Sequence, residues 1–266
     1  MPNTAASRPS ALVTGASGGI GRDLAKLLAA GGHDLILVAR SRDTLELLAA
    51  EMRREHGVES TVVAADLSEP DAAARVAREV EARGLRVDVL VNNAGFGLYG
   101  SYLETDGERE LQMIRLNVEA LTQLTKLLLP AMAARGAGRI LNVASTAAFQ
   151  PGPFMAVYYA TKAYVLSYSE ALAEELAGTR VTVTCLCPGV TETGFQSTAE
   201  LQRSRLVQSS VIMDSQTVAR AGYRGLMRGK RLVIPGAMNR LFVESIRFLP
   251  RRLVTRIVRA IQRSAA

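Results

Sequence analysis

A tyrosine and a lysine four residues apart, Tyr158 and Lys162, are the pair whose spacing could carry proton-transfer chemistry. On a helix this spacing places two side chains on one face, one turn apart. A free phenol has a pKa of about 10, which is too high for efficient proton transfer near neutral pH. A cation held beside the phenol favours the phenolate and lowers that pKa, so the pair could act as an acid/base group. A solvated helix face is the alternative, and the surrounding sequence must decide.

A glycine-rich turn joins a predicted strand over 10–13 to a predicted helix over 23–30. This order is typical of a dinucleotide site, because glycines let the backbone approach a pyrophosphate and the helix start offers N–H groups and a positive dipole end. The spacing is Gly15-x-x-x-Gly19-x-Gly21 instead of the commoner G-x-G-x-x-G, and a bare turn is the alternative. The expected phosphate-side residues are Gly15, Ser17, Gly18, Gly19, Ile20 and Gly21.

Arg40 ends a predicted buried strand that starts at Asp34, about 20 residues past the glycine turn. An NAD enzyme carries an acid at this place for the ribose 2′-hydroxyl. Here Arg40 and Ser41 come first, and no acid follows until Asp43. Arginine suits a 2′-phosphate through charge-assisted hydrogen bonds, which favours NADP(H). In the alternative, Ser41 caps the next helix and the arginine is solvated.

Strand and helix patterns alternate along most of the chain. Strands are predicted over 10–13, 34–40, 60–65, 87–91, 139–144, 181–187 and 230–236. The alternation predicts an α/β fold with a Rossmann-like, doubly wound parallel sheet of about seven strands in three α/β/α layers. Ligands on such sheets bind at the carboxyl ends of the strands. We therefore expect one shared rim for the residues that fall at these ends: Gly15, Arg40, Asp66, Asn92 and Ser145.

With these residues assembled, the chain resembles the short-chain dehydrogenase/reductase family in its single-domain branch. The resemblance runs from Ser10 to about Gly194. It rests on an ordered set of motifs: Thr14-Gly15-x-x-x-Gly19-x-Gly21, Asp66, Asn92-Asn93-Ala94-Gly95, Asn117, Ser145, Tyr158-x-x-x-Lys162 and Pro188-Gly189. It implies an NADP(H)-dependent oxidoreductase of EC 1.1.1 type, a carbonyl reductase or alcohol dehydrogenase that transfers hydride to an apolar ketone or aldehyde.

The resemblance also implies a role for each matching residue. Tyr158 would be the acid/base, and Lys162 would bind the nicotinamide ribose and lower the tyrosine pKa. Ser145 would hydrogen-bond the substrate oxygen, and Asn117 would hold a water in the proton relay. Asp66 would contact the adenine, with Asn92 and Gly95 on the ribose side. The other expected cofactor contacts are Leu67, Ala94, Pro188, Gly189, Val190, Thr191 and Thr193.

Net charge and composition exclude some functions. The tail from Asn239 onward has seven arginines and one glutamate, so it holds six of the chain's seven net positive charges. A near-neutral body with 5% aromatic residues and no Trp disfavours nucleic-acid binding. The two cysteines lie in the strand predicted over 181–187, which indicates packing in a reducing compartment, the cytoplasm. We expect no metal.

The three segments predicted are a disordered lead over 1–9, a catalytic Rossmann domain over 10–237 and a basic helical tail over 238–266. The tail indicates two amphipathic helices that break at Pro250. They could bind a membrane surface, or pack on the body over the substrate cleft or a dimer seam. The chain lacks the Asp-Gly-Gly ending of many family members, so a dimer is favoured over a tetramer.

Two other functions stay open: a catalytically silent NADP(H)-binding or membrane-associated scaffold, and an NAD-linked alcohol dehydrogenase. The intact set of Asn117, Ser145, Tyr158 and Lys162 disfavours the first, and Arg40 disfavours the second. The segment over 194–213, which is the substrate-binding region in the family, is mixed apolar. It indicates an apolar carbonyl substrate without naming one.

Overall fold

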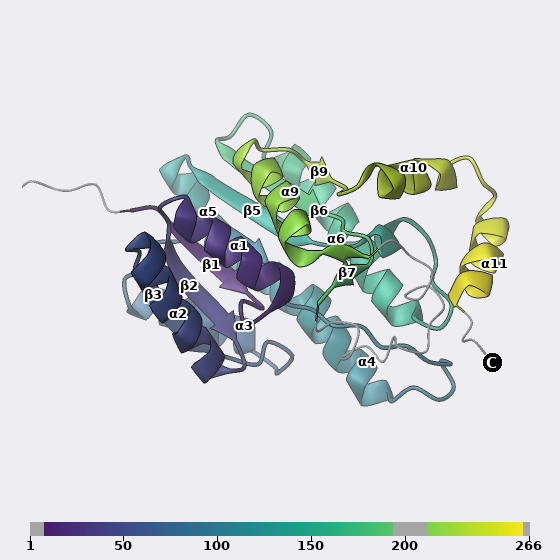
Figure 1. Cartoon of the computed structure of the whole chain (residues 1–266), viewed down its shortest axis with the longest axis horizontal. Coiled ribbons are helices and arrows are strands. Elements are labelled where there is room, and N and C mark those ends of the chain that lie inside the picture. Colours follow the sequence, from purple (N-terminus) through teal and green to yellow (C-terminus); the bar gives the residue numbers. More distant parts are fainter. Residues whose placement is uncertain (1–7, 194–211, 263–266) are drawn as a thin grey trace, which may run out of the picture.

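A seven-stranded parallel sheet forms the centre of the computed structural model, which describes residues 8–193 and 212–262 (Figure 1). The strand order is β3-β2-β1-β4-β5-β6-β9, so the direction of winding reverses between β1 and β4. The strands are β1 (Ser10–Thr14), β2 (Asp34–Ala39), β3 (Ser60–Ala64), β4 (Val89–Asn92), β5 (Gly138–Val143), β6 (Val181–Leu186) and β9 (Leu232–Val233). The predicted α/β class and doubly wound sheet are confirmed.

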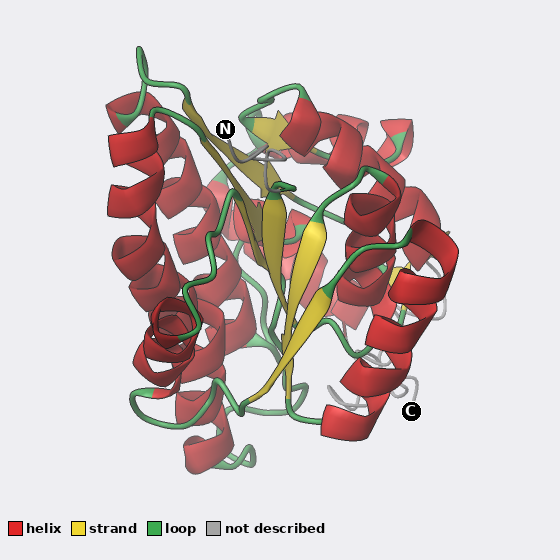
Figure 2. Cartoon of the chain, turned by 90° about the vertical axis from the view of Figure 1, so that its left-hand side faces the viewer, coloured by secondary structure: helices red, strands yellow, loops and turns green. Residues whose placement is uncertain are grey.

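Helices cover both faces of the sheet, as the edge-on view of Figure 2 shows. One face packs against α1 (Gly19–Ala30), α2 (Arg42–His56) and α9 (Ser215–Met227). The other packs against α3 (Ala72–Ala82), α5 (Leu121–Arg135) and α6 (Ala156–Glu175). Because strand side chains alternate, Ala11 and Val13 of β1 enter the first core while Leu12 enters the second. The three predicted layers follow from this alternation.

Several elements differ from the sequence prediction. Residues 107–135 form α4 (Gly107–Ile114), a π-helix at Arg115–Ala120 and then α5. The strand predicted over 230–236 is paired only at Leu232–Val233. A small second sheet pairs β7 (Thr191–Glu192) with β8 (Met213–Asp214). The lead over 1–7 and the segment over 194–211 lie outside the described residues.

The C-terminal extension forms two helices, α10 (Ala237–Ile246) and α11 (Arg251–Gln262), on either side of Pro250. In Figure 1, α11 lies at the end of the molecule opposite β3. Val243, Val254 and Val258 are buried against the body, which supports the packed alternative. Leu241 on α10 is 64% exposed. Within the described residues, every helix is too short or too polar to span a bilayer.

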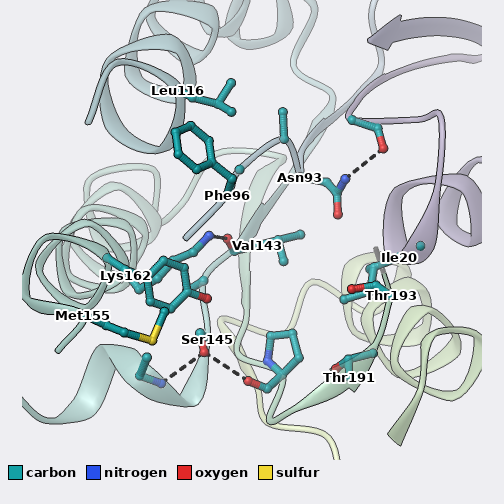
Figure 3. Close-up of a pocket in the computed structure, with 18 of the residues that line it drawn as sticks. Ile20, Asn93, Phe96, Leu116, Val143, Ser145, Met155, Lys162, Thr191 and Thr193 are labelled. Carbon is teal, nitrogen blue, oxygen red and sulfur yellow. Dashed lines mark hydrogen bonds between the residues drawn. The ribbon is translucent and has the colours of Figure 1, made fainter. Parts of the chain in front are cut away.

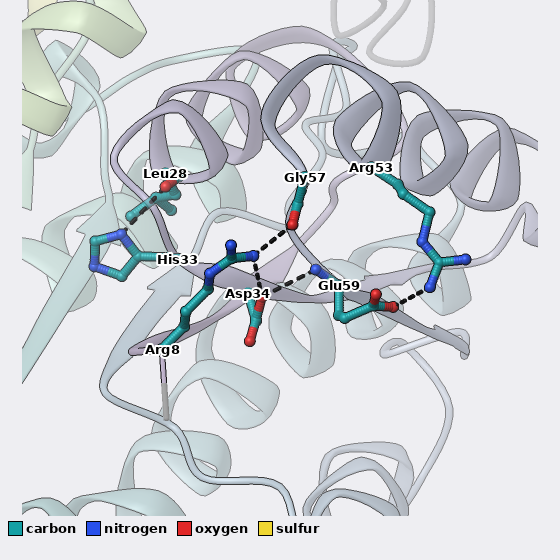
Figure 4. A network of polar contacts seen from close by, with 7 residues as sticks. All are labelled: Arg8, Leu28, His33, Asp34, Arg53, Gly57 and Glu59. Carbon is teal, nitrogen blue, oxygen red and sulfur yellow. Dashed lines mark hydrogen bonds and ion pairs between the residues drawn. The ribbon is translucent and has the colours of Figure 1, made fainter. Parts of the chain in front are cut away.

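Ion pairs tie together the amino ends of β2 and β3, away from the strand ends that were predicted to bind ligand (Figure 4). The Asp34 carboxylate accepts a hydrogen bond from the Glu59 amide at 2.9 Å and lies 3.9 Å from the Arg8 guanidinium. Arg53 pairs with the Glu59 carboxylate. These pairs are exposed and contribute little, so the edge is shaped mainly by the backbone ladder between β2 and β3.

A chain of buried amides and hydroxyls links the sheet to α5 and α6. The Asn92 amide donates to Thr125 Oγ1 at 3.0 Å and to Asn142 Oδ1 at 2.9 Å. The Asn142 amide donates in turn to Ser169 Oγ on α6 at 2.9 Å. Buried polar groups are costly unless they are paired, so this chain fixes how α6 lies on β4 and β5.

We predict that Asn142→Ala lowers the free energy of unfolding by roughly 2–4 kcal/mol, because it removes two buried hydrogen bonds and leaves a void. Urea denaturation followed by circular dichroism measures the change. Arg54→Ala, at a side chain that is 72% exposed, is the control and should shift stability by less than about 0.5 kcal/mol. Equal effects of the two substitutions would contradict the proposed link.

Candidate active site

One cavity of about 1470 Å³ lies at the carboxyl ends of the strands. Figure 3 shows the glycine-turn side of this cavity, with Ile20, Asn93 and Thr193, facing the side with Ser145, Met155 and Lys162. The following predicted site residues line it: Gly15, Ser17, Gly18, Gly19, Ile20, Arg40, Ser41, Asp66, Leu67, Ala94, Gly95, Ser145, Tyr158, Lys162, Pro188, Gly189, Val190, Thr191 and Thr193. The single rim expected from the strand ends is present. The three predicted residues outside this lining are Gly21, Asn92 and Asn117.

The glycine turn brings the backbone close to the cavity. Gly15 and Gly19 have φ angles of +66° and +51°, which are the left-handed conformations that favour glycine. A Cβ at Gly15 would lie 2.7 Å from Asn93 Nδ2, and one at Gly19 would lie 2.9 Å from Thr193 Cγ2. The α1 start has Gly18 as its N-cap, with no side-chain cap and no acid in the first turn. Its N–H groups and positive dipole end therefore fit a pyrophosphate.

Gly21 has a packing role instead of a cavity-lining one. A Cβ at this position would lie 2.3 Å from the carbonyl oxygen of Gly15 and 2.3 Å from Asn93 Nδ2. No side chain fits between the first turn of α1 and the end of β1. Gly21 was predicted to contact the cofactor, but here it lets the backbones of α1 and β1 pack closely.

Asn93, which the sequence reasoning passed over, locks the glycine turn to β4. Its side-chain amide donates to the Thr14 carbonyl oxygen at 2.9 Å. The Thr14 hydroxyl accepts from the backbone N–H groups of Asn93 and Ala94, each at 3.0 Å. Asn92, predicted on the ribose side, points away from the cavity toward Thr125 and Asn142. Consecutive strand residues face opposite ways, so the prediction for Asn92 is wrong and Asn93 lines the cavity.

Arg40, Ser41 and Asp66 line the cavity where β2 and β3 end. The Arg40 side chain is 78% exposed at the cavity edge, and its guanidinium lies 4.0 Å from Asp66 Oδ2. Asp66 Oδ1 accepts from the Ser68 backbone N–H at 2.9 Å, which fixes the loop after β3. The Ser41 side chain makes no cap bond to α2 and instead contacts Thr44 Oγ1 at 2.8 Å. An exposed guanidinium at this edge could pair with a phosphate through charge-assisted hydrogen bonds.

Ser145, Tyr158 and Lys162 meet where β5 and β6 end beside α6. Lys162 Nζ donates to the Val143 carbonyl oxygen at 2.9 Å and lies 5.8 Å from the centre of the Tyr158 ring. Ser145 Oγ donates to the Pro188 carbonyl oxygen at 3.4 Å and accepts from the Ala147 amide at 3.1 Å. The Ser145 hydroxyl also hydrogen-bonds the Tyr158 side chain. This arrangement places a hydroxyl, a phenol and an ammonium in the lining of the same cavity.

Burial, not the lysine charge, dominates the pKa of Tyr158. Burial raises the pKa of the phenol well above 10, and the hydrogen bond with Ser145 opposes this rise only in part. Burial also lowers the pKa of Lys162 from 10.5 to about 8, while the nearby Cys185 and Cys187 oppose that change. The pKa of Tyr158 in this structure is therefore shifted upward, opposite to the predicted lowering, because burial disfavours the phenolate. Tyr158 stays protonated at neutral pH, which is the form that donates a proton.

Asn117 braces the site from behind. Its Oδ1 accepts from the Phe96 amide at 3.1 Å, and its Nδ2 donates to the Phe96 carbonyl oxygen at 2.9 Å and to Thr161 Oγ1 at 3.1 Å. Thr161 Oγ1 donates to the Tyr158 carbonyl oxygen at 2.7 Å. The side chain lies in the π-helix, is buried and does not line the cavity. Protein groups occupy both ends of the side-chain amide, and the predicted role of Asn117 in holding a water stays a prediction.

A second group of lining residues was not named as site residues, although the C-terminal helices were offered as a possible cover for the substrate cleft. These residues come from the loop after β4, from α4, from the loop before α6 and from the C-terminal helices. Their signal in the sequence is weak, because apolar residues in amphipathic helices are typical of any packed face. The main ones are Phe96, Arg109, Gln150, Met155, Met238, Asn239, Phe242, Val258, Ile261 and Gln262.

The chain belongs to the short-chain dehydrogenase family, whose model matches residues 9–204. A putative ketoacyl reductase of Streptomyces coelicolor is 41% identical over 186 residues, covering 69% of this chain and 70% of the relative. Matches to very-long-chain 3-oxoacyl-CoA reductases of Laccaria bicolor and Anas platyrhynchos span only 52% and 58% of those longer relatives.

Solved structures share the fold over nearly the whole chain. A short-chain dehydrogenase from Sphingobium yanoikuyae in complex with NADPH is 34% identical, with a TM-score of 0.81 over 90% of this chain and 94% of that one. A relative from Burkholderia phymatum in complex with NAD is 25% identical, with a TM-score of 0.78 over 89% of this chain and 92% of that one. The fold therefore accommodates either nicotinamide cofactor, and the choice falls to local residues.

We predict that Lys162→Met stabilises the protein at neutral pH while it impairs the site. Below pH 8 the folded lysine is charged and its burial opposes folding. Between pH 8 and 10.5 the folded lysine loses its proton while the unfolded one keeps it, so the unaltered chain gains stability with rising pH. The difference in free energy of unfolding between the methionine variant and the unaltered chain should therefore fall by roughly 2–3 kcal/mol between pH 7.5 and 10. Urea denaturation of both proteins measures this gap, and a gap that does not change with pH would contradict it.

Proposed function

We propose that this chain is an NADP(H)-dependent carbonyl reductase of EC 1.1.1 type that acts on an apolar ketone or aldehyde. The observation that carries the proposal is the meeting of Ser145, Tyr158 and Lys162 in the same cavity as the glycine turn. The three groups come from two places in the fold, because Ser145 follows the end of β5 and Tyr158 and Lys162 lie near the start of α6. The opposite direction, alcohol oxidation, uses the same groups.

The geometry supports one mechanism. A bound nicotinamide cofactor supplies the hydride. As negative charge grows on the substrate oxygen, the Ser145 hydroxyl donates a hydrogen bond to it. Tyr158, protonated at neutral pH because burial raises its pKa, delivers the proton to that oxygen. Lys162, charged below about pH 8, stabilises the phenolate that forms and would hydrogen-bond the ribose of the cofactor.

We expect Tyr158→Phe to lower kcat by at least about 100-fold, since general acids contribute roughly 10²–10⁴. Reduction of acetophenone, followed by the loss of NADPH absorbance, measures the rate, and NADPH fluorescence titration should show unchanged binding. Tyr164→Phe, at a partly exposed tyrosine on α6, is the control and should keep activity. Activity of Tyr158→Phe within a few-fold of the unaltered chain would refute the proton-donor role.

The preference for NADP(H) rests on Arg40, the cation at the end of β2. A guanidinium–phosphate hydrogen bond contributes about 1.5–3 kcal/mol. Arg40→Asp should therefore lower the kcat/KM ratio of NADPH over NADH by roughly 10- to 100-fold. Arg42→Ala is the control, since Arg42 pairs with Glu46 one turn further into α2 at 3.7 Å. A preference for NADH in the unaltered chain would favour the NAD-linked alcohol dehydrogenase instead.

The substrate is proposed from the walls of the cavity. Phe96, Met155, Phe242 and Val258 make the substrate half mostly apolar. Several relatives are named as ketoacyl or 3-oxoacyl reductases, so a 3-oxoacyl thioester is a reasonable member of a test panel. NADPH binding without turnover across acetophenone, aliphatic ketones and 3-oxoacyl thioesters would favour the silent scaffold.

We further propose a cytoplasmic protein that forms a homodimer and touches membrane surfaces through its tail. On α10, α11 and their connection, Leu241, Phe248 and Leu253 are exposed beside Arg247 and Arg251, which is the pattern of an interfacial helix. Light scattering measures the oligomeric state.

Sedimentation with vesicles of equal phosphatidylserine and phosphatidylcholine tests the membrane contact. The double substitution Phe248→Ser with Leu249→Ser should reduce binding several-fold, because apolar area is lost while the arginines remain. The control is Leu47→Ser, on α2, where the leucine is 74% exposed. Failure of the unaltered chain to sediment would refute membrane contact.

A further inference from the structure

The far wall of the substrate cavity comes from α11, outside the segment that the family model matches. Val258, Ile261 and Gln262 line the cavity from this helix. Val254 and Val258 pack in the same apolar cluster as Met155, Tyr158 and Tyr159. The last turn of the C-terminal helix therefore lies against the helix that carries the proton donor.

Two tyrosines hold the end of α11 in place. The Gln262 side-chain amide donates to the Tyr159 hydroxyl, and the Tyr99 hydroxyl donates to the Gln262 backbone carbonyl oxygen at 2.6 Å. Gln262 is 1% exposed. Burial raises the pKa of Tyr159 to about 12, and the hydrogen bond from the Gln262 amide opposes that rise in part. We call Tyr99, Tyr159 and Gln262 the α11 latch.

The latch sits on a rigid support. A Cβ at Gly152 would lie 2.2 Å from the Tyr159 ring, so the backbone before α6 packs flush against that ring. The rings of Tyr158 and Tyr159 meet edge to face, with centroids 6.1 Å apart. The Tyr159 side chain therefore connects α11 to the proton donor, because it contacts both Gln262 and Tyr158.

Two features limit the strength of the latch. Gln262 Oε1 is buried and has no hydrogen-bond partner within the described residues. A buried acceptor without a partner opposes burial of the side chain and offsets part of what the Nε2 hydrogen bond contributes. The outer face of α11 exposes Leu253 and Ile257, so only a narrow stripe of the helix holds it to the body.

We propose that α11, closed by the Gln262 latch, sets the size of substrate that the site accepts. Gln262 and Tyr159 are positioning residues in this proposal, and Val258 and Ile261 are the wall that the substrate meets. The proposal rests on the reductase function for its kinetic test but not for its structural one. When the latch breaks, the wall moves outward and a bulkier ketone gains access relative to a smaller one.

Two matched ketones, acetophenone and benzophenone, test the size limit, since they differ by a methyl group replaced with a ring. The variants are Gln262→Leu, which removes the donor at similar size, and Tyr159→Phe, which removes only the acceptor. Each should raise the benzophenone-to-acetophenone ratio of kcat/KM by about tenfold or more. The double variant should match the single ones, because both break the same bond. Leu253→Ala, on the exposed face of α11, is the control.

Trypsin digestion tests the latch without turnover, because α11 carries Arg251, Arg252, Arg256 and Arg259. Latch variants should be cut in α11 at least several-fold faster than the unaltered chain and the control. Equal cutting rates would overturn the latch, and faster cutting with an unchanged ketone ratio would overturn its role in specificity. Without turnover in the unaltered chain, the reductase proposal falls, and calorimetric Kd values for the two ketones replace kcat/KM in the same comparison.

Discussion

The buried ammonium of Lys162 is the constraint around which the site is built. Its hydrogen bond to the Val143 carbonyl oxygen ties α6 to the end of β5, and it places the lysine within 5.8 Å of the Tyr158 ring centre. An ion in an apolar interior is costly, so the surrounding packing must hold it there. The pair of Asn142 and Ser169 supplies a second tie between the same two elements. Together these contacts decide where the phenol lies.

The same constraint assigns different tasks to adjacent residues. Tyr158 faces the cavity centre with Ser145, while Tyr159 turns to Gln262 on the C-terminal helix. Asn93 fastens the glycine turn, while Asn92 fastens the strands to α5. In each pair one side chain lines the cavity or holds the glycine turn, and its neighbour holds secondary-structure elements together. Residues of the site and residues that support the fold are therefore adjacent in the sequence.

Much of this could be predicted from the sequence, because local patterns determine it. Alternation of apolar strands with amphipathic helices predicted the parallel sheet, and strand ends predicted the rim that Gly15, Arg40 and Ser145 share. The direction of a side chain at a strand end was harder, since a shift of one residue reverses it, which is why Asn92 was chosen over Asn93. The raised pKa of Tyr158 could not be predicted, because it depends on how deeply the phenol is buried, and the spacing of residues in the sequence does not show that.

The packing of the C-terminal helices also could not be predicted from the sequence. Their amphipathic pattern predicted helices and a break at Pro250, but it could not choose between a membrane and the body as the surface they meet. The structure buries Val243 and the polar side chain of Gln262 against the body. Long-range packing made that choice, through Tyr99 and Tyr159, which lie 163 and 103 residues from Gln262 in the chain.

The central claim is that a carbonyl carbon and the cofactor meet beside Tyr158. Transfer of deuterium from NADPH labelled at the reactive carbon of its nicotinamide tests it most directly, with the alcohol product of acetophenone analysed by mass spectrometry. The account predicts one deuterium at the carbinol carbon and a single enantiomer, because the phenol and the hydride approach from fixed sides. Unlabelled or racemic alcohol, or none at all, would contradict it.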